Sequence, residues 1–165
     1  RQHMESHKGE FLYDWEDLIE LAMEEGKFNS LNKNFEVINI EFQDKNIGYY
    51  SLVKTAQGDE IVYAKRLNRN IYTRFVKNKR PKLTNSMTII LNRNRKKPNE
   101  YYLITMFPGD ESFKEPEDLN IKTKEELVEC LEFWRKHALI YDKSIIQGNS
   151  VIDYCPYGNL YLGVA

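Results

Sequence analysis

His137 is the side chain of this sequence best suited to moving a proton. An imidazole titrates near neutral pH, so it can donate or accept a proton when a phosphodiester bond is cleaved. His3 and His7 stand among the first seven residues, outside the expected folded body. A packed histidine at the edge of a core, beside Trp134, is the simpler structural interpretation, and the sequence leaves both open.

Three cations follow a short apolar stretch and could form a phosphate clamp. Lys65, Arg66 and Arg69 come directly after the apolar residues 61–64. Arginine makes bidentate contacts with phosphate oxygens, and lysine acts as a compact point charge. The alternative is a solvated strand end, which carries cations of the same kind.

Aromatic and basic side chains then alternate along the chain. Tyr72, Arg74, Phe75 and Lys77 form this pattern. Such a pattern suits single-stranded RNA, because rings stack on bases while cations hold the backbone. Phe75 and Val76 could equally belong to the core.

Hydroxyl side chains lie in or near two apolar strands further along. They are Thr84, Ser86, Thr88 and Thr105. Threonine is common in strands because its branched side chain packs well there. If these residues face the same cleft as His137, they could instead hold a phosphate or orient an attacking hydroxyl.

The charged residues are distributed unevenly. Residues 61–99 contain 12 basic and no acidic side chains, whereas residues 1–60 contain 6 and 13, and residues 100–165 contain 6 and 12. A run of charge is most often a solvated surface, but the absence of acids throughout this basic segment indicates an anion-binding surface. Besides the cations named above, we expect it to contact nucleic acid through Lys79, Arg80, Arg93, Arg95, Lys96 and Lys97.

Apolar periodicity predicts the elements that would position these side chains. Residues 10–28 repeat apolar side chains every three or four positions, which is typical of an amphipathic helix. A second helix begins at Thr123, whose spacing from Glu126 forms a capping box, and its buried stripe includes Leu131 and Trp134. Strands are expected at 35–42, 48–54, 60–67, 87–91 and 101–107, with short tail strands at 151–154 and 160–164.

This order of elements predicts an α+β fold. We expect an antiparallel β-sheet of about five strands with an N-terminal and a C-terminal helix packed on it, in one domain spanning residues 4–165. Residues 1–3 are expected to be a vector remnant before Met4. No apolar run reaches the roughly 18 residues that a membrane crossing needs.

Several chemistries are disfavoured by motifs that the sequence lacks. It has no P-loop, no dinucleotide-binding glycine motif and no nucleophile pattern of the G-x-S-x-G or Cys/His type. Cys130 and Cys155 do not form a Cys-x-x-Cys pair, so we expect no metal site and no cofactor. Two thiols without a secretion signal favour a reducing, cytoplasmic setting.

Taken in order, several segments resemble small bacterial and phage-borne domains of the barnase–EndoU–colicin–RelE superfamily of metal-independent ribonuclease toxins. The segments that carry the resemblance, within residues 61–141, are Lys65-Arg66, 72–77, 84–88, 102–105, Pro108-Gly109, Phe133-Trp134 and 137–139. Related chains carry a Pro-Glu-Pro-Trp-like run after the Pro-Gly turn, and residues 114–118 here lack the tryptophan.

The resemblance implies a small antiparallel sheet with helices packed against it, and cleavage of RNA by its own 2′-hydroxyl. His137 matches the residue that protonates the leaving 5′-oxygen. Lys65 and Arg74 match the cations that stabilise the phosphate, and Thr105 matches a hydroxyl near the site. Toxins of this type usually imply an acidic antitoxin that covers the basic cleft.

We therefore expect an endoribonuclease that leaves 2′,3′-cyclic phosphate products and has no membrane partner. Two alternatives stay open. One is a non-catalytic RNA- or DNA-binding module, and the other is an inhibitor or immunity-like protein that binds an acidic partner through the basic segment. His137 separates the enzyme from both alternatives, because binding alone does not need a titrating group.

Overall fold

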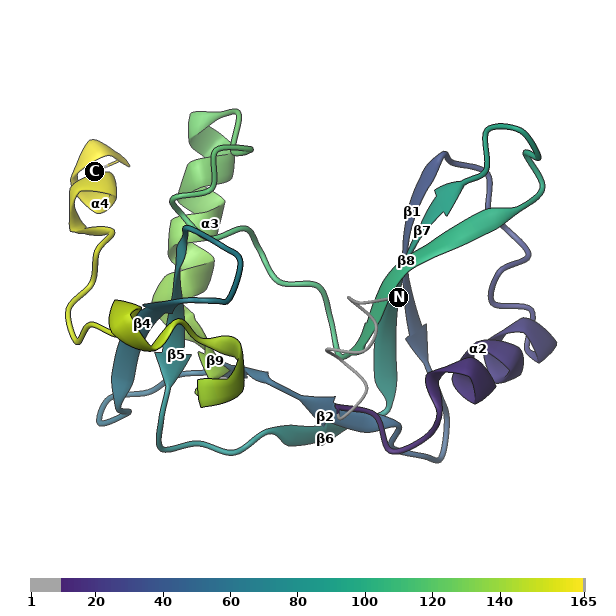
Figure 1. Cartoon of the computed structure of the whole chain (residues 1–165), viewed down its shortest axis with the longest axis horizontal. Helices are drawn as coiled ribbons and strands as arrows, with labels where there is room; N and C mark the ends of the chain where they lie inside the picture. Colours follow the sequence, from purple (N-terminus) through teal and green to yellow (C-terminus); the bar gives the residue numbers. More distant parts are fainter. Residues whose placement is uncertain (1–9, 165) are drawn as a thin grey trace. The chain divides into compact units, whose positions relative to one another are not determined.

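A computed structural model describes residues 10–164 of the chain. The described residues form an α+β structure that divides into two compact units (Figure 1). Unit 1 contains residues 10–50 and Lys82–Glu111, and unit 2 contains Ser51–Pro81 and residues 112–164. The prediction of one domain over residues 4–165 stays a prediction.

Unit 1 is built from one helix and five strands. They are α2 (Trp15–Glu24), β1 (Phe35–Glu41), β2 (Gly48–Tyr50), β6 (Lys82–Thr84), β7 (Ser86–Arg93) and β8 (Tyr101–Pro108). The strands β1, β7 and β8 form a three-stranded sheet in that order, and β2 pairs with β6. Both sheets are antiparallel.

The core of unit 1 lies between α2 and one face of the three-stranded sheet (Figure 1). Leu18 and Ala22 on α2 are buried, with Ile40 on β1 and Met87 and Ile89 on β7. In β1 the side chains alternate between this core and solvent, as a strand with one buried face requires. The other face of the sheet therefore keeps exposed side chains.

Unit 2 is built from four strands, two α-helices and two short 3₁₀ turns. They are β3 (Leu52–Lys54), β4 (Ile61–Lys65), β5 (Tyr72–Val76), α3 (Lys124–Lys136), β9 (His137–Ile140), η2 (Lys143–Ile145), η3 (Gly148–Ser150) and α4 (Gly158–Val164). The sheet order is β3-β9-β5-β4. The β5–β9 pair is parallel and the other two pairs are antiparallel.

The helix α3 begins at an identifiable capping signal. The Thr123 hydroxyl accepts a hydrogen bond from the Glu126 amide at 3.0 Å, and a Glu126 carboxylate oxygen accepts one from the Lys122 amide at 3.0 Å. The predicted capping interaction is therefore confirmed. Trp134 is 2% exposed, as predicted, and its indole nitrogen donates to the carbonyls of Phe113 and Lys114.

The α+β class is confirmed, but the strands are arranged differently from the prediction. Nine strands of the described residues form three sheets, rather than one sheet of about five strands. The strands β5, β6 and β9 were not expected. They are short, and β9 follows α3 without a break, so an apolar pattern continues from helix into strand with no turn signal between them.

Three predicted elements have other boundaries or another type. The first helix is confirmed only over Trp15–Glu24. Residues 160–164 are part of the helix α4 rather than a strand: Leu160, Tyr161 and Val164 pack on a core at helical spacing, while Leu162 is 76% exposed. Residues 151–154 form only an isolated bridge between Ile152 and Tyr63. The helices among residues 10–164 are too short or too polar to cross a bilayer.

Candidate functional site

Three of the four predicted catalytic residues belong to unit 2. Lys65 ends β4, Arg74 is the middle residue of β5, and His137 begins β9, whereas Thr105 lies in β8 of unit 1. In the antiparallel β4–β5 pair, Tyr63 lies opposite Arg74 and Lys65 lies opposite Tyr72. Because paired residues share a face of the sheet, Lys65 and Arg74 project from the same side.

The Arg74 guanidinium is fixed beside the start of β9. Its Nη1 donates to the Thr55 hydroxyl at 2.8 Å and to the backbone carbonyl of His137 at 3.1 Å. Burial raises the pKa of the facing Tyr63, contact with Cys155 adds to the rise, and the nearby Arg74 charge opposes it. Arg74 therefore holds a half-buried position between β5 and the C-terminal end of α3.

The His137 imidazole is held in one tautomer by the helix that precedes it. Its Nδ1 lies 3.0 Å from the Phe133 carbonyl oxygen, which can only accept, so Nδ1 carries the hydrogen. The ring stacks on Phe133 with 4.2 Å between centroids and an interplanar angle of 8°. The remaining nitrogen, Nε2, is therefore the atom through which this half-buried imidazole can take up and release a proton.

Lys65 contacts residues that are close to it in the chain, rather than forming part of the predicted clamp. Its Nζ donates to the Asn70 side-chain oxygen at 2.9 Å and lies 5.0 Å from the centre of the Tyr72 ring. Burial raises the pKa of Glu117, and the Lys65 charge opposes that rise. Lys65 is thus a cation near a half-buried carboxyl group that the sequence did not single out for chemistry.

Arg66 and Arg69 contact a buried carboxylate of their own unit. An Arg66 guanidinium nitrogen bonds to Glu115, and Arg69 donates to both Glu115 oxygens at 3.4 and 3.2 Å. The Thr73 hydroxyl donates to Glu115 at 2.8 Å, and Glu115 is only 4% exposed. Burial lowers the pKa of Arg66, and the Glu115 charge opposes that shift.

Glu115 is the residue that sequence reasoning missed. It lies outside the helices and strands, and its carboxylate occupies the position beside Arg66 and Arg69 that a phosphate was predicted to take. Its partners are 42 to 49 residues away in the chain. No local pattern signals a contact across that separation.

The remaining cations near β4 and β5 differ in whether they have a hydrogen-bond or ion-pair partner. The Lys79 ammonium donates to the Lys54 carbonyl at 2.7 Å and lies 3.2 Å from an Asp59 carboxylate oxygen. Lys77 and Arg80 are exposed, and the Lys77 ammonium lies 5.1 Å from the centre of the Tyr141 ring.

The aromatic residues of β5 belong to the packing of unit 2. Phe75 and Val76 are fully buried, so their interpretation as core residues is correct. Tyr72 packs against the cluster that contains Tyr63 and Tyr157. Stacking of Tyr72 or Phe75 on a nucleobase would therefore require these side chains to leave their packed positions.

Three of the four predicted hydroxyls of unit 1 make hydrogen bonds within that unit. The Thr88 hydroxyl is buried and donates to the Gly109 carbonyl at 2.7 Å. The Thr84 and Ser86 hydroxyls lie 3.1 Å apart. The Thr105 hydroxyl is buried, and no hydrogen-bond partner stands near it among residues 10–164.

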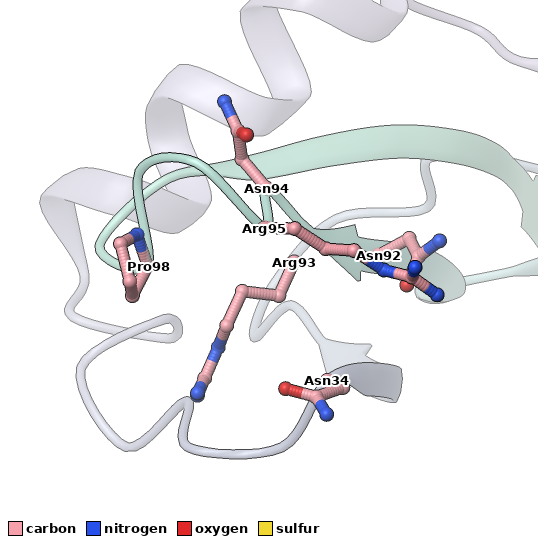
Figure 2. A pocket seen from close by; sticks show the side chains of 6 residues that line it. All are labelled: Asn34, Asn92, Arg93, Asn94, Arg95 and Pro98. Carbon is pink, nitrogen blue, oxygen red and sulfur yellow. The ribbon is translucent and has the colours of Figure 1, made fainter.

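The loop between β7 and β8, residues 94–100, carries three basic side chains of unit 1; we call it the hairpin loop. Arg95, Lys96 and Lys97 are exposed, and the Lys97 ammonium lies 3.9 Å from Glu100. Arg93, just before the loop, donates to the Tyr101 hydroxyl through two nitrogens, at 3.2 and 2.9 Å. A hollow of about 320 Å³ lies here, and Figure 2 shows the side chains that line it, which are Asn34, Asn92, Arg93, Asn94, Arg95 and Pro98.

The basic segment is therefore divided between the two units. Seven of its 12 cations lie in residues 61–81 of unit 2, and the other five lie in unit 1. Within residues 10–164, no group of three or more His, Cys, Asp or Glu side chains is arranged to hold a metal ion. The absence of a metal or cofactor from the reaction stays a prediction.

Comparison with protein-family models, with curated proteins and with solved structures finds no match to this chain. The resemblance to the barnase–EndoU–colicin–RelE superfamily, and the residue roles that it implies, stay predictions. The candidate site therefore rests on its own geometry, which is an imidazole of fixed tautomer and a guanidinium bonded to the carbonyl of the same residue.

Proposed function

We propose that this protein is an endoribonuclease of toxin type whose reaction centre is the Arg74–His137 region of unit 2. One observation carries the proposal: the Arg74 guanidinium lies 3.1 Å from the His137 carbonyl oxygen. This contact holds the cation for the phosphate, Arg74, at the backbone of the residue whose side chain is the proton donor for the leaving group, His137. Phosphodiester cleavage requires both.

In the proposed reaction the 2′-hydroxyl of RNA attacks the adjacent phosphorus and gives its proton to water. The bond between O2′ and phosphorus forms while the bond to the 5′-oxygen breaks. The imidazolium form of His137, which carries hydrogens on both Nδ1 and Nε2, donates its Nε2 proton to that oxygen and then takes up another from water, and the Arg74 guanidinium stabilises the negative charge that develops on the phosphate. The products are a 2′,3′-cyclic phosphate and a free 5′-hydroxyl, and no metal takes part.

Lys65 has a supporting role in this proposal. It projects from the same face as Arg74 and supplies a second positive charge to the phosphate. The role that the resemblance implies for Thr105, which lies in unit 1, stays a prediction. The setting that we propose is the cytoplasm, where Cys130 and Cys155 stay reduced, and the proposed partners are RNA and an acidic antitoxin.

The test is incubation of the pure protein with a mixed-sequence RNA oligonucleotide in EDTA, followed by end-group analysis. We expect 2′,3′-cyclic phosphate ends and no cleavage of an oligonucleotide with 2′-deoxyribose at the cut position. His137→Ala should lower the rate roughly 10²- to 10⁴-fold, the usual contribution of a positioned acid or base. RNA affinity should change far less than the rate, because a single imidazole contributes little to phosphate binding beside the arginines and lysines.

Two further variants separate chemistry from folding. Lys136→Ala removes the exposed side chain next to His137 and should leave the rate at the parent level. Arg74→Lys keeps a positive charge and should retain more activity than Arg74→Ala, which loses both binding and rate. Cleavage of the deoxy substrate, or a His137→Ala protein as fast as the parent and equally folded, would show that this mechanism is wrong.

One observation favours a second candidate function, a non-catalytic nucleic-acid-binding module. The cations of the hairpin loop are exposed in unit 1, in a different unit from His137. Such a module would bind RNA with a steep dependence on salt and leave it intact. The end-group experiment distinguishes the two functions, because only the enzyme produces cyclic phosphates.

A further inference from the structure

The three-stranded sheet of unit 1 has one face that the helix α2 does not cover. In β1, Phe35 is 56% exposed and Val37 is 41% exposed, while the intervening side chains face the core. In β8, Tyr102 is 60% exposed and Ile104 is 41% exposed. A soluble protein seldom leaves several large apolar side chains together on one strand surface without a ligand or partner for them.

The strand register brings the two aromatic side chains of this face into one row. Phe35 on β1 pairs with Asn92 on β7, and Asn92 pairs with Tyr102 on β8. Paired residues point to the same side of an antiparallel sheet. The row therefore consists of an aromatic ring, an amide and a second aromatic ring on three adjacent strands. Neighbouring strands in a sheet lie about 4.8 Å apart.

The opposite end of this face is closed by the chain that follows β8. Asn39 donates to an Asp110 carboxylate oxygen at 2.6 Å, and the Thr88 hydroxyl donates to the Gly109 carbonyl. The exposed rings are consequently confined to the end of the sheet that adjoins the hairpin loop. We call the row of Phe35, Asn92 and Tyr102 together with that loop the aromatic–basic face.

Positive charge stands next to the rings. Asn92 also lines the hollow of the hairpin loop, with Arg93 and Arg95 (Figure 2). Arg93 itself points to the other face of the sheet, because it pairs with Tyr101, which packs on the core, and two of its nitrogens donate to the Tyr101 hydroxyl. The side chains that line the hollow are amides, guanidiniums and a proline, with no carboxylate among them.

We propose that the aromatic–basic face binds single-stranded RNA. Phe35 and Tyr102 stack on successive bases, Asn92 hydrogen-bonds to a base edge between them, and Arg95, Lys96 and Lys97 contact the backbone phosphates. An apolar protein partner would cover the rings but leave the amide and the cations without acceptors. The proposal extends the proposed function and rests on it only for the choice of RNA as the natural ligand.

The test uses a ligand that cannot be cleaved, a fluorescent single-stranded 12-nucleotide oligodeoxythymidine, with affinity measured by anisotropy. Tyr102→Ala and Phe35→Ala should each weaken binding roughly 5- to 150-fold, because the loss of one stacked ring has an effect of this size. Tyr102→Phe should bind as the parent does, since stacking needs the ring and not the hydroxyl. The matched control is Tyr154→Ala, which removes a 65% exposed tyrosine of unit 2.

Each outcome has a defined meaning. A duplex of the same length should bind more weakly than the single strand, because its bases are already stacked. The proposal is overturned if both ring variants bind as the parent does, if the duplex binds as tightly, or if the variants only convert a dimer to a monomer. The probe has no 2′-hydroxyl and cannot be cleaved, so its affinity does not depend on the proposed reaction, and a failure of the proposed cleavage is distinguishable from a failure of this surface.

Discussion

The two units of this protein provide different partners to the cations of residues 61–99. In unit 2, Arg66 and Arg69 contact the buried Glu115, and Lys79 pairs with Asp59, while Lys77 and Arg80 stay exposed. In unit 1, Arg95 and Lys96 stand exposed on a loop. The pairing with a buried carboxylate therefore occurs in unit 2, and both units also carry exposed charge.

The comparison shows that a count of charges along a chain does not give the charge of a surface. Residues 61–99 contain no acid, yet the acids that neutralise the first part of this segment come from elsewhere in the chain. Glu115 lies 49 residues from Arg66. A basic segment therefore predicts an anion-binding surface only where the fold keeps distant carboxylates away, which in this chain favours the hairpin loop.

The strongest way to test this division is to remove the charge of Glu115. Glu115→Gln keeps the shape of the side chain but leaves the partly buried Arg66 and Arg69 without their carboxylate. We expect a loss of roughly 3 kcal/mol in the free energy of unfolding, as for other broken buried ion pairs. Urea denaturation measures it.

The control for that experiment is Glu111→Gln, which removes an exposed carboxylate of unit 1 and should change stability by less than about 0.5 kcal/mol. If Glu115→Gln also proved this mild, the ion-pair cluster would not hold unit 2 together. Arg66 and Arg69 would then be available to a ligand, and the contrast between the units would disappear.

A smaller effect is expected at the hydroxyl that completes the same cluster. Thr73→Val removes the donor that lies 2.8 Å from Glu115 and retains the branched shape of a fully buried side chain. The expected loss is about 1–3 kcal/mol, the range for a hydrogen bond to a charged group. Thr55→Val, which removes a hydroxyl that accepts from Arg74, provides a comparison outside the cluster.

The smallest effect is expected on the exposed side of the comparison. Lys97→Ala removes a cation that lies 3.9 Å from Glu100, in a pair where both side chains are more than half exposed. Exposed ion pairs contribute between about 0 and 1 kcal/mol, so the unfolding midpoint should hardly move. A large loss of stability would mean that the hairpin loop is structural rather than available to a ligand.

The parts of the fold that the sequence predicts are those with a local signal. The strands β1, β4, β7 and β8 follow from apolar runs, and the start of α3 follows from the spacing of Thr123 and Glu126. The signals for β5 and β9 are weak because a parallel pair between them forms across more than 60 residues of chain.

The candidate site is predictable to a similar extent. Residue chemistry is enough to select His137 and Arg74, but the tautomer of the imidazole depends on the Phe133 carbonyl, which only the helix brings to it. Phe35 and Tyr102 lie in one row only because of the register in which β1, β7 and β8 pair. The two residues are 67 positions apart in the chain, and a period-two pattern within each strand does not predict how such distant strands align. Long-range pairing is the information that local patterns lack.

The most direct test of the division between the units is the salt dependence of RNA affinity. For the parent protein we expect a slope of log affinity against log salt of about −3 or steeper, set by the number of phosphates contacted. Replacing Arg95, Lys96 and Lys97 together with Ala should reduce the magnitude of the slope by about 2, at roughly 0.7 for each lost phosphate contact with a single strand. The matched control replaces three exposed lysines of unit 2, Lys122, Lys124 and Lys143, and should keep the parent slope. An unchanged slope in the hairpin-loop variant, or an equal reduction in the control, would contradict the account.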